Sequence, residues 1–204
     1  MPNPFFSFKQ FTVYHDRCAM KVGTDGVLLG AWTDLSHSHR ILDIGTGTGL
    51  IALMMAQRSP EAQITAIDLD AEAVSQARDN IQHSPWKDRI EALLQDVCTY
   101  SIDKKFDTIV SNPPYFIDSL QCPDNQRNTA RHTDTLDARR LLEKAAELLT
   151  PDGRFSLILP ADQTDDLFRM AEALGLYPSR WTKVITRPGL PPKRSLIEFQ
   201  KKVQ

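Results

Sequence analysis

Short β-rich runs alternate with helical patterns from residue 40 onward, and this alternation limits the possible folds more than any other feature of the chain. The runs that read as buried strands are Arg40–Ile44, Gln63–Asp68, Ile90–Leu94, Phe106–Ser111 and Arg154–Leu159. The helical patterns are Leu50–Arg58, Ala71–Gln82, Asp137–Leu149 and about 162–174. Because strands separated by helices connect through right-handed crossovers, the sequence predicts an α/β fold whose parallel sheet carries helices on both faces.

The end of the chain departs from this alternation. Arg180–Thr186 and Ser195–Gln200 both read as strands, and the segment between them is short and contains three prolines. A crossover to a parallel neighbour needs a dozen or more residues, so these two strands should pair antiparallel. The expected result is a mostly parallel sheet with an antiparallel last strand.

The 204 residues fit one domain, and no linker, repeat or low-complexity tract divides them. We expect 36–204 to form the core and 1–35 to form an N-terminal segment that covers it. Residues 5–32 are rich in aromatic side chains and do not fit the alternation. Neither do residues 116–136, a long connection of the kind that is usually functional or disordered.

Three glycines occupy the turn between the first predicted strand and the first predicted helix, in Asp43-Ile44-Gly45-Thr46-Gly47-Thr48-Gly49. Glycines there let a ligand approach the main chain, and ligands of open α/β sheets bind at the carboxyl ends of strands. The spacing is not the G-x-G-x-x-G of dinucleotide sites. A pyrophosphate prefers helix N-terminal amides without a carboxylate nearby, whereas Asp43 suits the sulfonium and ammonium of S-adenosylmethionine. The alternative is a tight turn that binds no ligand.

Acidic residues also follow the next two predicted strands. Asp68, with Leu69 beside it, ends the second strand, and Asp96 comes just after the third. A carboxylate at the first position can accept from both hydroxyls of a ribose, and one at the second can accept from an adenine amino group. Asp is common in loops of any kind, so Asp96 by itself is uninformative. The predicted cofactor site comprises Asp43, Gly45, Gly47, Gly49, Asp68, Leu69 and Asp96.

Asn112-Pro113-Pro114-Tyr115 follows the predicted strand Phe106–Ser111. Its prolines fix φ and donate no hydrogen bond, so the segment is stiff and its carbonyls are pure acceptors. An amino group on an aromatic base is a poor nucleophile because its lone pair is delocalised into the ring. Asn112 Oδ1 and the Pro113 carbonyl can hold the two hydrogens of such a group and direct its lone pair at a methyl donor, without a strong general base.

Tyr115 offers a ring on which a splayed-out base can stack, worth about 1–3 kcal/mol. The motif therefore predicts methylation of an exocyclic amino group, with Asn112, Pro113 and Tyr115 as catalytic residues and Pro114 against the substrate. A proline-rich turn after a strand is the structural alternative. We find no Ser/His/Asp or Cys/His nucleophile pattern.

Composition and cysteine spacing indicate the cellular compartment of the protein. Cys18, Cys98 and Cys122 are widely spaced without a CxxC pair, and His37-x-His39 has no third ligand nearby, so we expect no disulfide framework, no metal site and a reducing compartment. No apolar run reaches the roughly 20 residues of a membrane span, and the start does not read as a signal peptide. The expected location is cytoplasmic.

Charge is unevenly distributed around a net charge of −2. From 176 to 204 there are seven Lys or Arg and one Glu, while the middle of the chain is acidic. A basic edge of this kind can contact the phosphates of RNA. It also fits an ordinary solvated face, and charge alone does not decide between the two.

Nearly the whole chain resembles the bacterial class I methyltransferases that methylate N6 of adenosine 37, next to the anticodon of valine tRNA. The most specific stretch is an N-terminal signature, Lys9-Gln10-Phe11 followed by His15-Asp16-Arg17-Cys18-Ala19-Met20-Lys21-Val22-Gly23-Thr24-Asp25-Gly26. The glycine loop and Asn112-Pro113-Pro114-Tyr115 are shared with many methyltransferases.

The resemblance implies a Rossmann-like fold with a seven-stranded sheet, S-adenosylmethionine as cofactor and tRNA as partner. It implies that Asp43, the glycines, Asp68 and Asp96 surround the cofactor, that Thr24 and Asp25 lie by its methionine end, and that Asn112 and Tyr115 lie at the target base. On local reasoning, the segment around Thr24 equally fits a helix cap. We expect tRNA contacts from Arg127, Arg131, His132, Lys193 and Arg194.

Members of this family usually continue past the last strand, whereas this sequence stops at Gln204. If that tail helps to hold tRNA, the chain should bind cofactor well and substrate poorly.

Other acceptors fit the same chemistry, namely the N2 of guanine in rRNA, the N6 of adenine in DNA and the amide of a protein glutamine. DNA enzymes of this type need a sizeable recognition domain, for which the chain has no room. The alternative of another class is a cofactor-binding module that binds RNA without catalysis. Extrusion of the target base costs least in a single-stranded loop, which favours tRNA.

Overall fold

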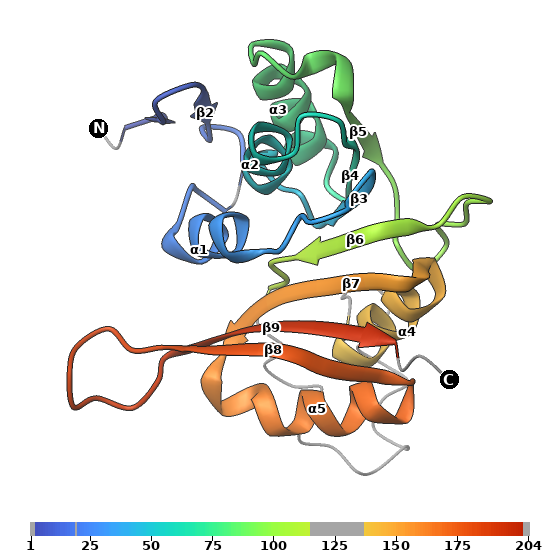
Figure 1. Ribbon diagram of the computed structural model, residues 1–204. Coiled ribbons are helices and arrows are strands. Elements are labelled where there is room, and N and C mark those ends of the chain that lie inside the picture. Colours follow the sequence, from blue (N-terminus) through green and yellow to red (C-terminus); the bar gives the residue numbers. More distant parts are fainter. Residues whose placement is uncertain (1–2, 19, 115–136, 202–204) are drawn as a thin grey trace, which may run out of the picture.

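The computed structural model describes residues 3–18, 20–114 and 137–201. The strands of its main sheet are β3 (Arg40–Ile44), β4 (Gln63–Asp68), β5 (Ile90–Leu94), β6 (Phe106–Ser111), β7 (Leu149–Pro160), β8 (Leu176–Val184) and β9 (Arg194–Lys201). They lie in the order β5-β4-β3-β6-β7-β9-β8 (Figure 1). From β5 to β7 neighbours are parallel, and β9 is antiparallel to both β7 and β8. The predicted mostly parallel sheet with an antiparallel last strand is confirmed.

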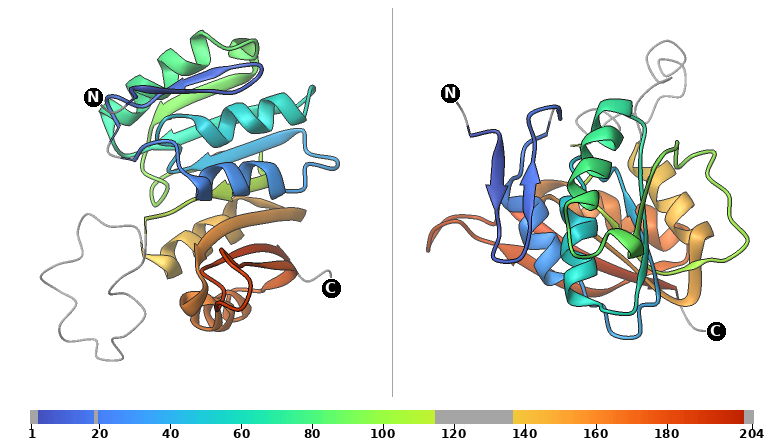
Figure 2. Two further views of the ribbon diagram at one scale, coloured as in Figure 1. Left: turned by 90° about the vertical axis from the view of Figure 1, so that its left-hand side faces the viewer. Right: turned by 90° about the horizontal axis from the view of Figure 1, so that it is seen from above.

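Helices cover both faces of this sheet (Figure 2). They are α1 (Thr24–Trp32), α2 (Leu50–Arg58), α3 (Ala71–Gln82), α4 (Ala138–Leu148) and α5 (Thr164–Ala173), with short 3₁₀ turns η1 (Lys87–Arg89) and η2 (Ala161–Gln163). From β3 to β6 the strands and the two helices between them keep the bounds that the sequence predicts. Asp137 precedes α4 as its N-cap, because its carboxylate accepts a hydrogen bond from Arg140 N at 2.7 Å.

Alternate residues of the central strands point to opposite faces and enter two apolar clusters. Ile41 and Ile64 belong to the cluster beneath α1, α2 and α3, whereas Leu42 and Ile44 belong to the cluster beneath α4 and α5. Strands buried on both faces need apolar residues at nearly every position, as in all-parallel sheets. Asp43, the buried charged residue of β3, is therefore an exception that needs a local partner.

Three strands differ from their predicted bounds, and β9 does so by only one residue at each end. β7 begins at Leu149, five residues before the predicted start at Arg154, because an irregularity in the ladder lets Leu149 pair with Phe106. β8 runs over Leu176–Val184 rather than Arg180–Thr186. It starts directly after Gly175, whose φ of +73° turns the chain, and the buried side chain of Leu176 fixes that start.

The N-terminal segment forms regular structure that the sequence pattern did not predict. β1 (Phe5–Ser7) and β2 (Thr12–Tyr14) make an antiparallel hairpin that lies beside α3, and α1 packs against α2. The close packing is possible because a side chain at Gly30 would meet Met54 Sδ at 2.6 Å.

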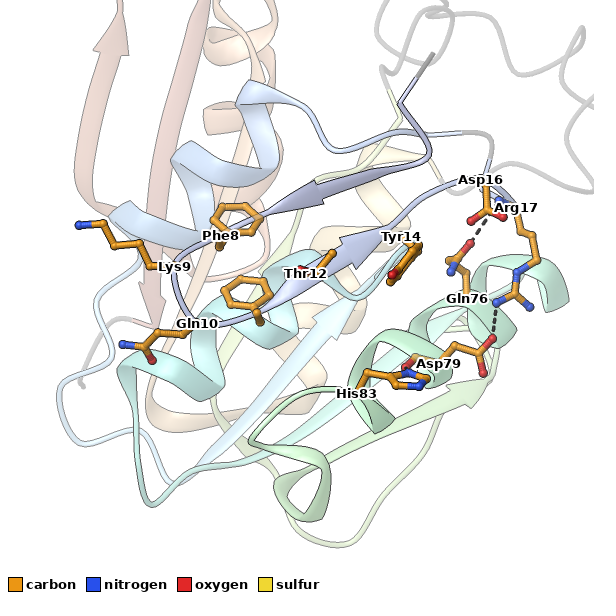
Figure 3. Close-up of a pocket in the computed structure, with 11 residues that line it drawn as sticks. Phe8, Lys9, Gln10, Thr12, Tyr14, Asp16, Arg17, Gln76, Asp79 and His83 are labelled. Carbon is orange, nitrogen blue, oxygen red and sulfur yellow. Dashed lines mark hydrogen bonds and ion pairs between the residues drawn. The ribbon is translucent and has the colours of Figure 1, made fainter. Parts of the chain in front are cut away.

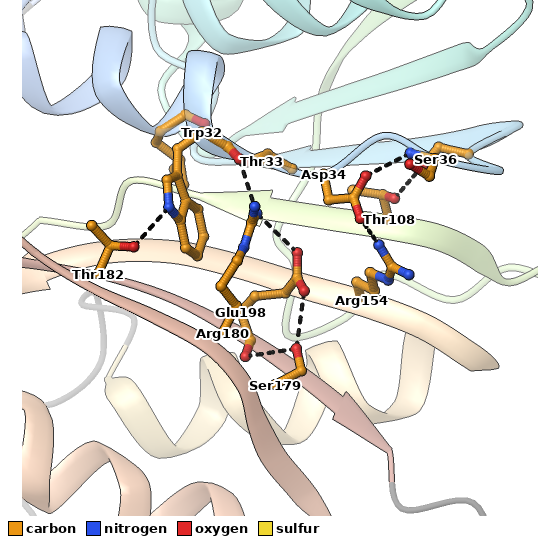
Figure 4. A network of polar contacts seen from close by, with 12 residues as sticks. Trp32, Thr33, Asp34, Ser36, Thr108, Arg154, Ser179, Arg180, Thr182 and Glu198 are labelled. Carbon is orange, nitrogen blue, oxygen red and sulfur yellow. Dashed lines mark hydrogen bonds and ion pairs between the residues drawn. The ribbon is translucent and has the colours of Figure 1, made fainter.

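The C-terminal end of α1 is held to the sheet by arginines (Figure 4). The Arg180 guanidinium lies 3.8 Å from the centre of the Trp32 ring, donates to the Trp32 carbonyl at 2.9 Å and pairs with the buried Glu198 at 3.2 Å. Cations favour the C-terminal end of a helix, where carbonyls are left unpaired. This contact fixes α1 relative to β8 and β9.

Candidate active site

A cavity of about 830 Å³ opens at the carboxyl ends of β3 and β6. Its walls come from four segments that are distant in sequence: 20–28, 45–51, 112–114 and the ends of β8 and β9. A volume of roughly 300–1,000 Å³ is typical of small-molecule and cofactor sites.

The glycine loop forms one wall of this cavity. Gly45 and Gly47 have φ of +71° and +55°, and a side chain at either position would project into open space. The amides of Gly45 and Thr46 both donate to the Ile67 carbonyl, at 2.9 and 3.0 Å, which ties the loop to β4. Gly49 has another role, because it caps α2 and a side chain there would meet Ala77 at 3.3 Å. The loop is thus rigid and leaves its surface free for a ligand.

Asp43 lies beneath the loop rather than in the cavity. Its carboxylate is fully buried, and Oδ2 accepts from the Thr46 hydroxyl at 2.7 Å and from Ala52 N at 3.2 Å. Oδ1 has no hydrogen-bond partner among the described residues. Burial raises the pKa of the Asp43 carboxyl to about 7, the two hydrogen bonds oppose the rise, and the charge of Asp68 adds to it. Asp43 therefore shapes the loop from behind it, and its burial favours the neutral carboxyl in the cofactor-free protein.

We expect Asp43→Asn to remove a pH dependence of stability in the cofactor-free protein. Because the folded-state pKa is raised, this carboxyl stabilises the fold most below about pH 4, and that contribution is lost as pH rises through about 7. An Asn at this position keeps an acceptor for Thr46 and never ionises. The free energy of unfolding can be measured in urea at pH 5 and at pH 8. The variant should be more stable relative to the natural protein at pH 8 than at pH 5. Parallel pH profiles in the two proteins would refute this.

Asp68 and Asp96 lie at the carboxyl ends of neighbouring strands, next to the cavity. Asp68 Oδ2 accepts from Gly47 N at 2.8 Å, and its Oδ1 accepts from Asp70 N at 3.0 Å. Asp96 Oδ1 accepts from Cys98 N at 2.8 Å. Leu69 is 57% exposed, so its apolar surface is open to a ligand. The structure brings these predicted residues to one edge of the sheet, although they do not line the cavity itself.

The Asn112-Pro113-Pro114 segment forms another part of the cavity wall. The preceding residue, Ser111, is buried and donates to the Ile44 carbonyl at 2.9 Å, which joins β6 to the base of the glycine loop. The Asn112 side chain makes no hydrogen bond within the described part of the chain and lines the cavity. Its carboxamide is available to a substrate.

The first turn of α1 and the start of β9 close the cavity. Thr24 and Asp25 line it together with Lys193 and Arg194, and Arg194 Nε donates to Asp25 Oδ2 at 2.8 Å. Gly26 allows α1 to approach, because a side chain there would meet Leu50 at 3.1 Å. The sequence assigned Asp25 to the cofactor and Arg194 to the substrate, and the structure joins the two residues in one ion pair.

Several predicted residues lie outside the described residues: Tyr115, Arg127, Arg131 and His132. Other lining residues were missed, among them Met20, Lys21, Val184 and Thr186. No sequence pattern indicates Val184 and Thr186, because only the three-dimensional path of β8 and β9 brings this part of the chain to the cavity.

Comparison with known proteins identifies the family. Residues 19–175 match the model of the methyltransferase small domain. The chain is 62% identical over 200 residues to the tRNA1(Val) (adenine(37)-N6)-methyltransferase of Phocaeicola vulgatus, which covers 98% of this chain and 85% of that protein. The protein of the same name from Tolumonas auensis is 48% identical, covering 97% and 83%. The chain belongs to the tRNA1(Val) (adenine(37)-N6)-methyltransferase family.

Solved structures of other methyltransferases share the fold of this family member. A predicted O-methyltransferase from Agrobacterium tumefaciens superposes with a TM-score of 0.68 at 22% identity, covering 89% of this chain and 82% of that one. A glycopeptide N-methyltransferase complexed with S-adenosylmethionine has a TM-score of 0.64 at 17% identity, covering 90% of each chain. These likenesses establish the class I methyltransferase fold.

Within residues 3–18, 20–114 and 137–201, no helix has the length and apolar character needed to cross a membrane. The same residues contain no group of three or more His, Cys, Asp or Glu side chains arranged to hold a metal ion.

Proposed function

We propose that this chain transfers a methyl group from S-adenosylmethionine to the N6 amino group of an adenosine in tRNA, at position 37 of valine tRNA. The observation that carries the proposal is the cavity of about 830 Å³ that the glycine loop and Asn112 line together. The relatives that are 62% and 48% identical to this chain over the aligned residues are named for that activity.

The residues around the glycine loop fit S-adenosylmethionine. Gly45 and Gly47 leave open space where any side chain would intrude, and Asp68 can accept from ribose hydroxyls while it holds Gly47 N. The carboxylate of Asp25 suits the positive charges of this cofactor, and a cation bound at the loop would favour ionisation of the buried Asp43 carboxyl behind it. When bound, the cofactor supplies an electrophilic methyl group.

Asn112 and Pro113 fit the acceptor amine. In the proposed reaction the adenine N6 donates one hydrogen to Asn112 Oδ1 and the other to the Pro113 carbonyl. This geometry favours a pyramidal nitrogen with its lone pair aimed at the methyl donor, so catalysis comes from orientation and fixed dipoles. We assign Tyr115 to stacking on the same base and Pro114 to its contact surface.

The hairpin of β8 and β9 extends past the cavity as an arm (Figure 1). Lys183, Arg187 and Lys193 make this arm basic, and Lys193 also lines the cavity. Cations near the target base can hold the RNA backbone through its phosphates. We assign the arm, with Arg127, Arg131 and His132, to tRNA binding, and Arg194 to the cavity wall through its pair with Asp25.

The test is incubation of the purified protein and labelled S-adenosylmethionine with total tRNA from a strain that lacks the enzyme. Nucleoside mass spectrometry should detect N6-methyladenosine in the valine tRNA fraction. Methylation of guanine N2, of DNA adenine or of a protein glutamine instead would overturn the assigned acceptor and keep the chemistry. No transfer to any of these acceptors, with cofactor still bound, would favour a non-catalytic RNA-binding module.

A further inference from the structure

The N-terminal signature forms a second hollow that the proposed reaction does not use. This hollow, of about 630 Å³, lies between the β1–β2 hairpin and α3 (Figure 3). Lys9 and Gln10 lie at one end and Arg17 at the other, while Gln76 comes from α3 and His83 directly follows that helix. Its volume is within the range of small-molecule sites, roughly 300–1,000 Å³.

The lining has the chemistry of a site for a flat, polar ligand. It contains aromatic rings, side-chain amides and cations, and none of its residues is Leu, Ile, Val or Met. A docked apolar helix or a lipid chain would need such aliphatic contacts. Tyr14 is 46% exposed. Its ring packs at a tilt against Phe5, its partner on β1, with the ring centres 5.6 Å apart, and the rest of its surface is open to the hollow.

The Gln76 side chain offers an amide donor to the hollow. Gln76 is 1% exposed, and its Oε1 accepts from Arg17 N at 3.2 Å. Its Nε2 donates to no group in the described part of the chain. Because Gln76 lines the hollow, an acceptor supplied by a ligand can bond to this amide.

The charges of the hollow are partly neutralised. Arg17 pairs with Oδ2 of Asp79. Asp16 and the other carboxylate oxygen of Asp79 can accept from an amino group, and Lys9 is exposed at the other end of the hollow. A base amine at the carboxylates and a phosphate at Lys9 match this arrangement.

The side chain of Asn80 links the hairpin beside the hollow to the glycine loop beside the cavity. Asn80 Oδ1 accepts from Tyr14 N at 2.9 Å, and its Nδ2 donates to the Tyr14 carbonyl at 2.8 Å and to the Thr48 carbonyl at 2.9 Å. Thr48 lines the cavity. The hairpin and the glycine loop are therefore held in a fixed relation, as two sites for one substrate would require.

We propose that the hollow binds an unpaired nucleotide of the RNA substrate, other than the target adenosine. The inference rests on the proposed function. The base stacks on Tyr14 and accepts a hydrogen bond from Gln76 Nε2, and its phosphate lies at Lys9. Stacking of a base on an aromatic side chain is the common way in which proteins hold unpaired nucleotides.

The experiment measures the Kd for labelled valine tRNA in the presence of S-adenosylhomocysteine, together with the Kd for the cofactor and the methylation rate. Tyr14→Ala should weaken tRNA binding about tenfold, whereas Tyr14→Phe, which keeps the ring, should stay close to the natural protein. Lys9→Glu should also weaken tRNA binding. Its matched control is Lys104→Glu, an exposed lysine on the turn before β6, which should have no effect. Cofactor affinity should be unchanged in all four.

The outcomes separate the two proposals. Unchanged tRNA affinity in Tyr14→Ala and Lys9→Glu, while the natural protein methylates tRNA, overturns the nucleotide site and leaves the proposed function intact. Weaker cofactor binding in Tyr14→Ala shows that the hairpin acts through the glycine loop, and also overturns the site. Failure of the natural protein to methylate any tRNA overturns both.

Discussion

Asn112→Ala should lower kcat by about 100- to 1,000-fold while the Kd for S-adenosylmethionine stays within about threefold of its natural value. The carboxamide lines the cavity and makes no hydrogen bond within the described part of the chain, so its removal leaves the scaffold intact. What is lost is a fixed acceptor for one amino hydrogen, and with it the orientation of the nitrogen lone pair. Calorimetry of cofactor binding and single-turnover methylation of tRNA check the two halves of the prediction.

Asn112→Asp is the control for this prediction. It keeps an acceptor oxygen at the same place and should retain more activity than the alanine variant. If both variants lost cofactor binding together with turnover, Asn112 would be part of the cofactor site rather than the acceptor site.

Asp68→Ala should raise the Kd for S-adenosylmethionine by about 100-fold or more, with a much smaller effect on the rate at saturating cofactor. Hydrogen bonds to a charged group contribute about 1.5–3 kcal/mol each, and a ribose offers two hydroxyls. The substitution also removes the acceptor for Gly47 N at 2.8 Å, so the glycine loop loses its link to this side chain. Both effects act on cofactor affinity.

Asp70→Ala is the matched control, because Asp70 is an exposed carboxylate two residues from Asp68 and has a different structural role. Its Oδ1 accepts from Glu72 N at 2.9 Å and caps α3. Its loss should cost about 1 kcal/mol of stability without changing the cofactor Kd. An equal loss of cofactor affinity in Asp68→Ala and Asn112→Ala would contradict the division of labour proposed for the two residues.

The sequence by itself determined the central part of the fold and the placement of Asp43, Asp68 and Asn112 at one edge of the sheet. From Arg40 to Ser111 the strands and helices keep their predicted bounds, because apolar periodicity, glycines and caps act within a few residues of one another. The carboxyl ends of parallel strands meet at one edge of the sheet. For this reason the predicted positions of Asp43, Asp68 and Asn112 along the chain were enough to bring them together.

Only the tertiary structure decided the segments whose conformation depends on distant contacts. The β1–β2 hairpin has short strands, and Asn80 and Gln76 on α3 hold it in place. α1 owes its position to Arg180, 148 residues away from Trp32. Asp43 was predicted from its charge, yet its full burial beneath the loop depends on the packing of α2. Local propensity cannot encode such contacts, since their free energy is gained only when the whole sheet has assembled.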